Sequence, residues 1–206
     1  MIEILLNDIF LSVLLLAFYG TVAFTVGVFV GRSSSYILKR EKELVEHVAY
    51  HDYLTGMRNR ASYELHMKRL VLKQKSIGII MLDVNGLKNY NDLKGHDAGD
   101  KFLQDSAKLI RLAFRGEECR FYRVGGDEFV VTVLQNTQKV CAEARGRVNK
   151  CCDDWNLEHP NEIITIASGY AIWTPGMFMD RVEKEADKWM YRYKEIMKED
   201  GVQGIR

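Results

Sequence analysis

The sequence Val-Gly-Gly-Asp-Glu-Phe at residues 124–129 places two acids beside two glycines. The residues on either side of this motif are rich in aromatic and β-branched side chains, which favour strands. Gly125 and Gly126 between them predict a two-residue hairpin turn. Because glycine has no Cβ, a bulky anion can lie against the main chain there. The chain is therefore expected to contain an antiparallel sheet in which a hairpin tip presents Asp127 and Glu128, an arrangement that suits a metal-bound polyphosphate.

A third carboxylate ends an apolar segment upstream of the hairpin. Residues 77–84 are almost entirely hydrophobic apart from Asp83, as expected of a buried strand that delivers an acid to the edge of a sheet. The loop that follows, residues 85–100, is dense in Lys, Asn, Asp and Gly. Alone, the hairpin motif would also fit a solvated turn. Two acid-bearing strand ends beside such a loop indicate a nucleotide site.

The first part of the chain predicts a membrane anchor. Residues 9–31 contain no charged side chain, and this segment exceeds the roughly 20 residues that a helix needs to cross a bilayer. Glu3 and Asp8 precede it, whereas Arg32 and further bases follow. The positive-inside rule then places everything after Arg32 in the cytoplasm. The acidic start disfavours a cleaved signal peptide, so we expect a single-pass protein of the inner, cytoplasmic membrane.

Three segments are expected along the chain: a transmembrane anchor over 1–31, a helical linker over 32–51 and a catalytic domain over 52–206. In the linker, Ile37 and Leu44 fall near heptad spacing. A short parallel coiled coil between two copies and a simple amphipathic connector helix both fit this pattern.

Charge and cysteine content exclude some classes of function. The chain has 29 basic and 28 acidic residues, a net charge of +1, so no nucleic-acid-binding surface is expected. The four cysteines form no Cys-x-x-Cys pair, and in the cytoplasm they are expected to be reduced thiols.

The order and spacing of these motifs resemble the GGDEF family of diguanylate cyclases. The resemblance covers residues 52–198, from the opening motif Asp52-Tyr-Leu-Thr-Gly to a closing helix that carries Lys194. It implies an α+β fold with a palm-like, ferredoxin-like antiparallel central sheet flanked by helices. The elements expected after the linker are helix 62–74, strand 77–84, a helix after Leu87, helix 98–114, strands 119–124 and 129–133, helix 138–155, strand 163–173 and helix 177–199.

The resemblance also assigns metal ligands. It implies that Asp83, Asp127 and the Val84 carbonyl hold Mg²⁺ or Mn²⁺, two ions per active site. Mg²⁺ prefers oxygen ligands and keeps several waters, so one or two carboxylates per ion suffice. Neighbouring residues of a strand face opposite ways, and the family assigns Glu128 an additional catalytic or second-metal role.

The substrate implied is GTP. The family's phosphate-binding positions match Lys88, Lys194 and Lys198, and Arg123 is a further candidate at the dimer interface. Its guanine-reading positions match two residues, Asn91 and Asp100. A carboxylate accepts from both N1–H and N2–H₂ of guanine, a donor pair that adenine lacks, so these residues predict GTP over ATP.

The implied reaction joins two GTP molecules into cyclic di-GMP and two pyrophosphates in a homodimer, with one GTP held by each domain. Two departures from the family stand out. Asn85 replaces an acid found in many members, and we expect only a modest consequence. Residues 116–119 are Gly-Glu-Glu-Cys where many members carry an Arg-x-x-Asp inhibitory product site, so we expect that site to be absent. The alternative is a catalytically silent GGDEF-like module that binds GTP or a partner protein for signalling.

Overall fold

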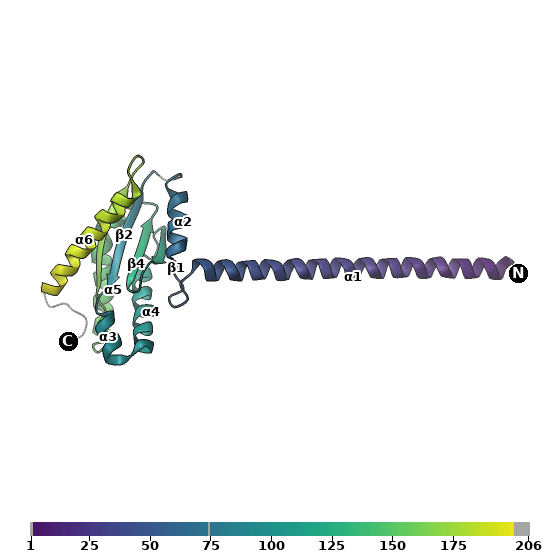
Figure 1. The fold of residues 1–206 in the computed structure, drawn as a ribbon, viewed down its shortest axis with the longest axis horizontal. Helices are drawn as coiled ribbons and strands as arrows, with labels where there is room; N and C mark the ends of the chain where they lie inside the picture. Colours follow the sequence, from purple (N-terminus) through teal and green to yellow (C-terminus); the bar gives the residue numbers. More distant parts are fainter. Residues whose placement is uncertain (1, 74, 200–206) are drawn as a thin grey trace. The chain divides into compact units, whose positions relative to one another are not determined.

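A computed structural model of the chain describes residues 2–73 and 75–199. The chain divides into two compact units, Met1–His47 and Val48–Arg206. The first belongs to one long helix and the second holds a layered domain (Figure 1).

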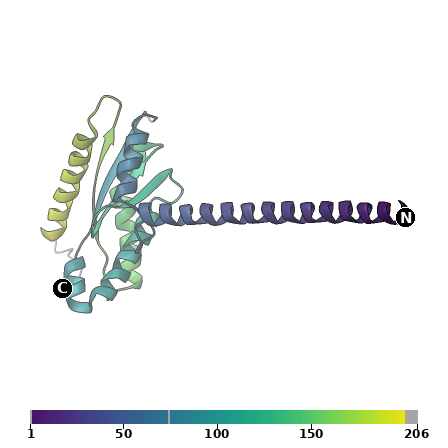
Figure 2. The ribbon, with the colours of Figure 1, turned by 45° about the vertical axis from the view of Figure 1, so that its right-hand side comes forward.

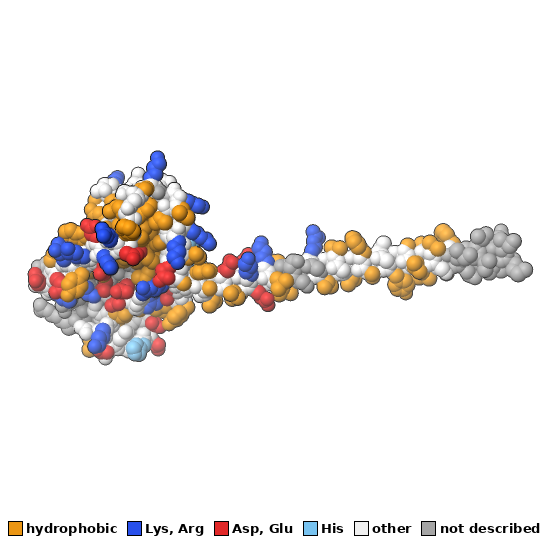
Figure 3. Space-filling model, turned by 45° about the horizontal axis from the view of Figure 1, so that its top comes forward, with side chains coloured by type: hydrophobic (Ala, Val, Ile, Leu, Met, Phe, Trp, Pro, Cys, Tyr) orange, Lys and Arg blue, Asp and Glu red, His pale blue; other side chains and the backbone are white. Residues whose placement is uncertain are grey.

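Helix α1 runs without a break from Ile2 to Tyr50, so residues 32–50 are helical. Its segment Phe10–Val30 is long and apolar enough to cross a membrane, with a mean hydropathy of 2.3. Every side chain described in that segment is exposed. Hydrophobic side chains cover this part of the helix, and charged ones follow it (Figure 3). A helix segment that is apolar on all sides suits a lipid environment.

The domain is built on a five-stranded sheet in the order β1-β3-β4-β2-β5. All neighbouring strands are antiparallel except β1 and β3, which are parallel. The strands are β1 (Arg58–Asn59), β2 (Ile77–Val84), β3 (Cys119–Arg123), β4 (Glu128–Val133) and β5 (Ile166–Trp173). The helices are α2 (Arg60–Leu70), α3 (Leu87–Lys94), α4 (His96–Ala113), α5 (Thr137–Glu158) and α6 (Met179–Glu199).

Each face of the sheet has its own hydrophobic core because successive residues of β2 alternate between them. Ile80 and Leu82 pack with residues of α4 and α5 on one face. Ile79 packs with residues of α2 and α6 on the other, and Figure 2 shows α6 alongside the sheet. Every residue that is buried in the described part of the chain lies between Met57 and Met197. The core of the domain is therefore complete without the first 47 residues.

The predicted α+β fold with its central antiparallel sheet is confirmed, and each predicted helix and strand has a counterpart. The two-residue turn is wrong. Arg123 pairs with Phe129 and the Val124 N–H donates to the Glu128 carbonyl, so three residues, 125–127, form the loop. Neither glycine of that loop has a positive φ. The short edge strand β1 was not predicted, since two residues carry no periodic pattern.

Candidate active site

Asp83 lies near the end of β2 and is only 7% exposed. The Lys194 ammonium of α6 donates a hydrogen bond to its Oδ1 at 2.7 Å. Burial raises the pKa of Asp83 and the charge of Asp127 adds to this, whereas Lys194 lowers it, and the net shift is upward. The pKa of this buried carboxylate stays raised even beside a lysine, so one ammonium group does not fully compensate its negative charge.

Close helix packing brings Lys194 to this carboxylate. A Cβ on Gly169 of β5 would collide with the backbone of α6 at Ala186 and Met190. The glycine therefore lets α6 lie directly against the sheet. Lys194 follows Met190 by one helical turn, on the same side of α6.

The hairpin loop lies at the same edge of the sheet. Glu128 is paired with Asp83 across β4 and β2, so the two side chains leave the same face. The Asp127 carbonyl accepts a hydrogen bond from the Val84 N–H at 3.0 Å, which ties the loop to the end of β2. A Cβ on Gly125 would meet the Glu128 carboxylate. This glycine therefore makes room for Glu128 to fold back over the loop.

Arg123 fixes the loop from the other side. Its guanidinium donates to the Gly126 carbonyl at 2.7 and 3.1 Å and to both carboxylate oxygens of Asp52 at 3.1 and 3.2 Å. Burial alone would raise the pKa of Asp52, but hydrogen bonds from Thr55 and Arg123 outweigh it and leave the pKa lowered. The guanidinium thus has protein partners, and its role toward phosphate stays a prediction.

The Asp52–Arg123 bridge was missed by sequence reasoning. The sequence does indicate a turn at Asp52, because an Asp three residues before a Thr commonly caps a turn. Asp52 does accept from the Thr55 backbone at 2.8 Å and from its hydroxyl at 2.6 Å. Arg123, the ion-pair partner, lies 71 residues further along the chain, and no local sequence pattern predicts that pairing.

The two predicted guanine-reading residues lie on α3 and α4. Gly86, with a φ of 81°, turns the chain from β2 into α3, a conformation that favours glycine. A Cβ on Gly99 would collide with the Asn91 side chain, so Asn91 packs beside the helix turn that carries Asp100. Within the described residues, the Asn91 side-chain oxygen is buried without a hydrogen-bond partner. Asp100 is exposed and accessible to a ligand.

Two predicted phosphate-binding lysines lie outside this network of contacts. Lys88 is exposed in the first turn of α3. Lys198 is exposed and donates to Glu195 at 2.7 Å, although its charge still lowers the pKa of Asp83. The structure joins Asp83, Lys194 and the hairpin loop directly. The phosphate-binding roles of Lys88 and Lys198 stay predictions.

These elements match a known domain. The family model described as diguanylate cyclase, GGDEF domain, matches residues 49–200. The chain belongs to the GGDEF family. The match begins just before Asp52 and ends beyond Lys198, so all the site residues named above lie inside the GGDEF domain.

Two curated proteins illustrate what the chain is similar to. Diguanylate cyclase DgcS of Shewanella oneidensis is 31% identical over 153 residues, covering 71% of this chain and 50% of that protein. An uncharacterized membrane protein of Staphylococcus saprophyticus is 25% identical over 152 residues, covering 69% of this chain and 42% of that protein. The chain thus spans half or less of these relatives.

A solved structure shares the fold. The coiled coil and GGDEF domain of DgcB from Caulobacter crescentus, crystallised in complex with c-di-GMP, aligns with a TM-score of 0.69. The alignment has 23% identity and covers 82% of this chain and 94% of that one. The predicted family and fold are confirmed by these comparisons.

GGDEF diguanylate cyclases generally use divalent metal ions, and the donors here suit one. Asp83 and Asp127 carry carboxylate oxygens at one edge, and a cation between them would relieve the upward pKa shift of Asp83. No group of three or more His, Cys, Asp or Glu side chains in the described residues is placed to hold a metal ion. Two carboxylates still suffice for Mg²⁺, which takes its other ligands from water and phosphate.

At both departures from the GGDEF pattern, Asn85 and residues 116–119, side chains form hydrogen bonds within the domain. Asn85 is 8% exposed, and its amide donates to the Thr165 hydroxyl at 3.2 Å and to the Met197 sulfur at 3.7 Å. Residues 116–119 turn the chain from α4 into β3. There Glu117 accepts from Arg147 at 2.8 Å, so this acid is part of a structural ion pair.

Proposed function

We propose that the chain is a membrane-anchored diguanylate cyclase that converts two GTP into cyclic di-GMP and two pyrophosphates as a homodimer. The observation that carries the proposal is the single sheet edge formed by Asp83, Lys194 and the loop of Asp127 and Glu128. Family membership supports the reaction class.

Asp83 and Asp127, with the Val84 carbonyl, would hold Mg²⁺ or Mn²⁺, two ions per active site, and Glu128 takes a catalytic or second-metal role. A bound ion activates the attacking hydroxyl and stabilises charge on the phosphorus. Glu128 lies across from Asp83 in the register, which places a second acid on the same face. The loop is held by the main chain of Val84 and by Arg123, so Asp127 is positioned before substrate arrives.

The chain's own cations bind the triphosphate. Lys194 is already beside Asp83 and would share its charge between that carboxylate and a phosphate oxygen. Lys88 and Lys198 approach from α3 and α6, and Arg123 supports the loop or reaches a phosphate of the partner's GTP. On the base side, Asp100 accepts from guanine N1–H and N2–H₂, and Asn91 lies beside it.

In each half-reaction the 3′-hydroxyl oxygen of one GTP forms a bond to the α-phosphorus of the other. The bond from that phosphorus to the β-phosphate oxygen breaks, pyrophosphate leaves with the electron pair, and the hydroxyl proton is lost to solvent. Two such steps close the ring. Each domain holds one GTP, so two domains must face each other, and positioning supplies much of the rate.

The anchor places this domain in the cytoplasm. Phe10–Val30 supports a span of the inner membrane, and Arg32 and the bases that follow it support a cytoplasmic orientation of the domain. The linker of α1 joins the anchor to the cyclase domain, either as a two-stranded coiled coil or as a single helix.

Product inhibition through an Arg-x-x-Asp site is absent in this proposal because residues 116–119 lack both side chains. Calorimetry with cyclic di-GMP tests this directly. Tight binding that disappears when residues 116–119 are replaced would contradict it.

The cyclase proposal is tested by product formation. Residues 32–206, which contain the complete core, are incubated with GTP and Mg²⁺ at high protein concentration, and nucleotides are separated by chromatography. We expect cyclic di-GMP from the parent and none from Asp127→Ala. If the full chain in nanodiscs also gives no product while GTP still binds, the silent-module alternative holds.

A further inference from the structure

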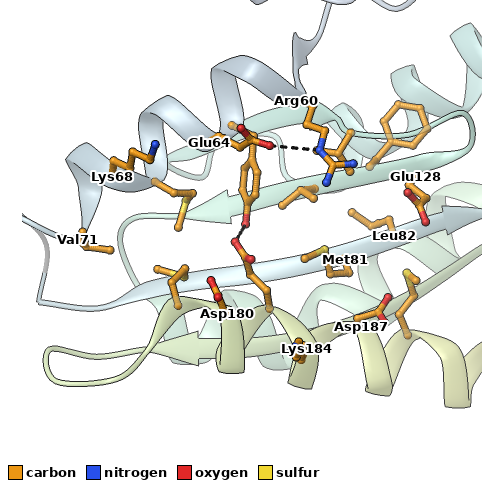
Figure 4. Close-up of a pocket in the computed structure, with 18 residues that line it drawn as sticks. Arg60, Glu64, Lys68, Val71, Met81, Leu82, Glu128, Asp180, Lys184 and Asp187 are labelled. Atoms are coloured by element: carbon orange, nitrogen blue, oxygen red, sulfur yellow. Dashed lines mark hydrogen bonds and ion pairs between the residues drawn. The ribbon is translucent and has the colours of Figure 1, made fainter.

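A pocket of about 530 Å³ lies between α2 and α6, over strands β2 and β4. Figure 4 shows Lys68 and Val71 at one end of it and Glu128 at the other. Its size falls in the range of roughly 300–1,000 Å³ typical of small-molecule sites. Of the residues assigned to the nucleotide site, only Glu128 lines it. The pocket is therefore a separate feature of the domain that touches the catalytic edge at one point.

The floor of the pocket is apolar and rich in methionine. Met67 of α2, Met81 of β2, and Met179 and Met190 of α6 all line it, together with Val130. Methionine is flexible and its sulfur is polarisable, so such a floor adapts to flat hydrophobic groups, aromatic rings in particular.

The rim of the pocket is acidic. Asp180, Glu183 and Asp187 follow a spacing of three and four residues on α6, which puts all three on the face toward the pocket. Glu64 and Glu128 add two further carboxylates against three cationic side chains. One of those, Arg60, is already paired with Glu64. The net negative charge that remains at the rim favours binding of a cationic ligand.

One carboxylate is oriented by a buried phenol. Tyr63 of α2 donates to the Glu183 carboxylate at 2.6 Å across the pocket. Burial and the neighbouring Glu183 raise the pKa of Tyr63, so the phenol stays protonated. The carboxylate is thereby held at the mouth of the apolar floor, with its second oxygen left to a ligand.

We propose that the pocket between α2 and α6 is a binding site for a small organic cation with an aromatic body. The aromatic part lies on the methionine floor, and the cationic group meets Asp180 and Glu183. Charge complementarity selects this class over hydrophobic anions and over nucleotides, which the acidic rim repels. Cyclase activity is not required for this binding.

Methionine-methyl NMR tests the site on residues 32–206 labelled with ¹³C-methyl methionine. Four of the seven methionines in that segment line the pocket, whereas Met57, Met177 and Met197 do not. The probe is 2-(2-naphthyl)ethylamine, and its matched control is 2-naphthylacetate, which has the same ring and the opposite charge. We expect saturable shifts of the four pocket methyls with the amine and little change with the carboxylate.

A double variant, Asp180→Asn with Glu183→Gln, removes both charges and keeps the side-chain shapes. Each of the two exposed ion pairs is worth about 1.4- to fivefold in affinity, so removing both should lower amine affinity about two- to thirtyfold. The matched control, Asp153→Asn with Glu158→Gln on α5, should bind the amine as the parent does.

Three results would overturn the proposal. One is the absence of saturable shifts in a parent whose spectrum is well dispersed. A second is equal binding of the amine and the carboxylate, or shifts spread over Met57 and Met197. The third is unchanged affinity in the Asp180→Asn, Glu183→Gln variant.

Discussion

The proposed site has two edges that are built differently. At the metal edge, Asp83 is buried and paired with Lys194, and the hairpin loop is tied to β2 by a main-chain hydrogen bond. At the guanine edge, Asp100 is exposed on α4 and the Asn91 side chain packs on Gly99. In the proposed site the sheet pre-organises the metal edge, whereas a bound ligand would complete the guanine edge. Substitutions at the metal edge should therefore lower the turnover rate, and substitutions at the guanine edge should lower the selectivity for GTP.

The largest effect is expected at Asp127. Asp127→Asn keeps the side-chain shape but removes the charge that would face the metal. Turnover should therefore fall roughly 10²- to 10³-fold, as when one pre-organised electrostatic group is removed. Steady-state cyclisation assays measure this, with Asp153→Asn on α5 as the matched control. Wild-type turnover in Asp127→Asn would contradict the role of the loop.

Lys194 and Lys198 form a matched pair one helical turn apart. Lys194→Met leaves Asp83 buried without its partner, so kcat/KM for GTP should fall about ten- to a hundredfold, the value of a charged hydrogen bond. Lys198 is exposed and paired with Glu195, so Lys198→Met should lower kcat/KM about fivefold at most. A larger loss in Lys198→Met would reverse the importance of the two lysines.

At the guanine edge, Asp100→Asn should change selectivity more than rate. The amide cannot accept from both guanine donors, so the preference for GTP over ATP should fall about ten- to a hundredfold. Competition binding with the two nucleotides measures this, and Asp97→Asn in the first turn of α4 is the control. Unchanged selectivity in Asp100→Asn would remove Asp100 from guanine recognition.

Asp52, near the start of the domain, is connected to the hairpin loop of the metal edge through Arg123. Its folded-state pKa is lowered, so its stabilising contribution is present above the ordinary pKa of 3.8 and is lost as the pH falls through the folded-state value. Asp52→Asn should lower the free energy of unfolding by roughly 1–3 kcal/mol at pH 7. It should also flatten the loss of stability in acid.

Denaturant unfolding of residues 32–206 at neutral and acidic pH measures both effects of Asp52→Asn. Glu185→Gln, on the exposed side of α6, is the control. A variant that loses stability in acid as steeply as the parent would show that Asp52 is not held ionised by Thr55 and Arg123.

The smallest effect is expected for Asn85→Asp. The Asn85 amide points to Thr165 and Met197 rather than supplying a metal ligand, so an acid there should change turnover less than about threefold, within about 0.6 kcal/mol. The same cyclisation assay measures it. A gain of several powers of ten would mean that the site lacks a charge that its family needs.

The order of elements and both acid-bearing strand ends could be predicted from the sequence. The apolar segment 77–84 and the alternation in the hairpin strands are local patterns, and burial of their residues follows directly. The loop geometry could not be predicted, because the Gly-Gly pair favours a two-residue turn by itself. The main-chain bond from Val84 to Asp127 and the Glu128 carboxylate over Gly125 together set a longer loop.

Contacts between residues far apart in the sequence explain the other features that could not be predicted. The Lys194 pair with Asp83 joins residues 111 positions apart, and a lysine pair on a helix usually indicates only a solvated face. Its placement depends on Gly169, whose role appears only when α6 is packed on β5. The Asp52–Arg123 bridge and the pocket between α2 and α6 arise in the same way, from elements that meet only in the folded domain.

The division of the site into two edges is tested most directly by Mn²⁺ binding to residues 32–206 with an unreactive α,β-methylene analogue of GTP. Electron paramagnetic resonance reports the bound ion. The account predicts that Asp127→Asn weakens Mn²⁺ binding about tenfold or more while the analogue still binds in preference to its adenine counterpart. It predicts that Asp100→Asn keeps the Mn²⁺ signal per bound nucleotide and loses that preference. Loss of the metal in Asp100→Asn, or an unchanged Mn²⁺ affinity in Asp127→Asn, would contradict it.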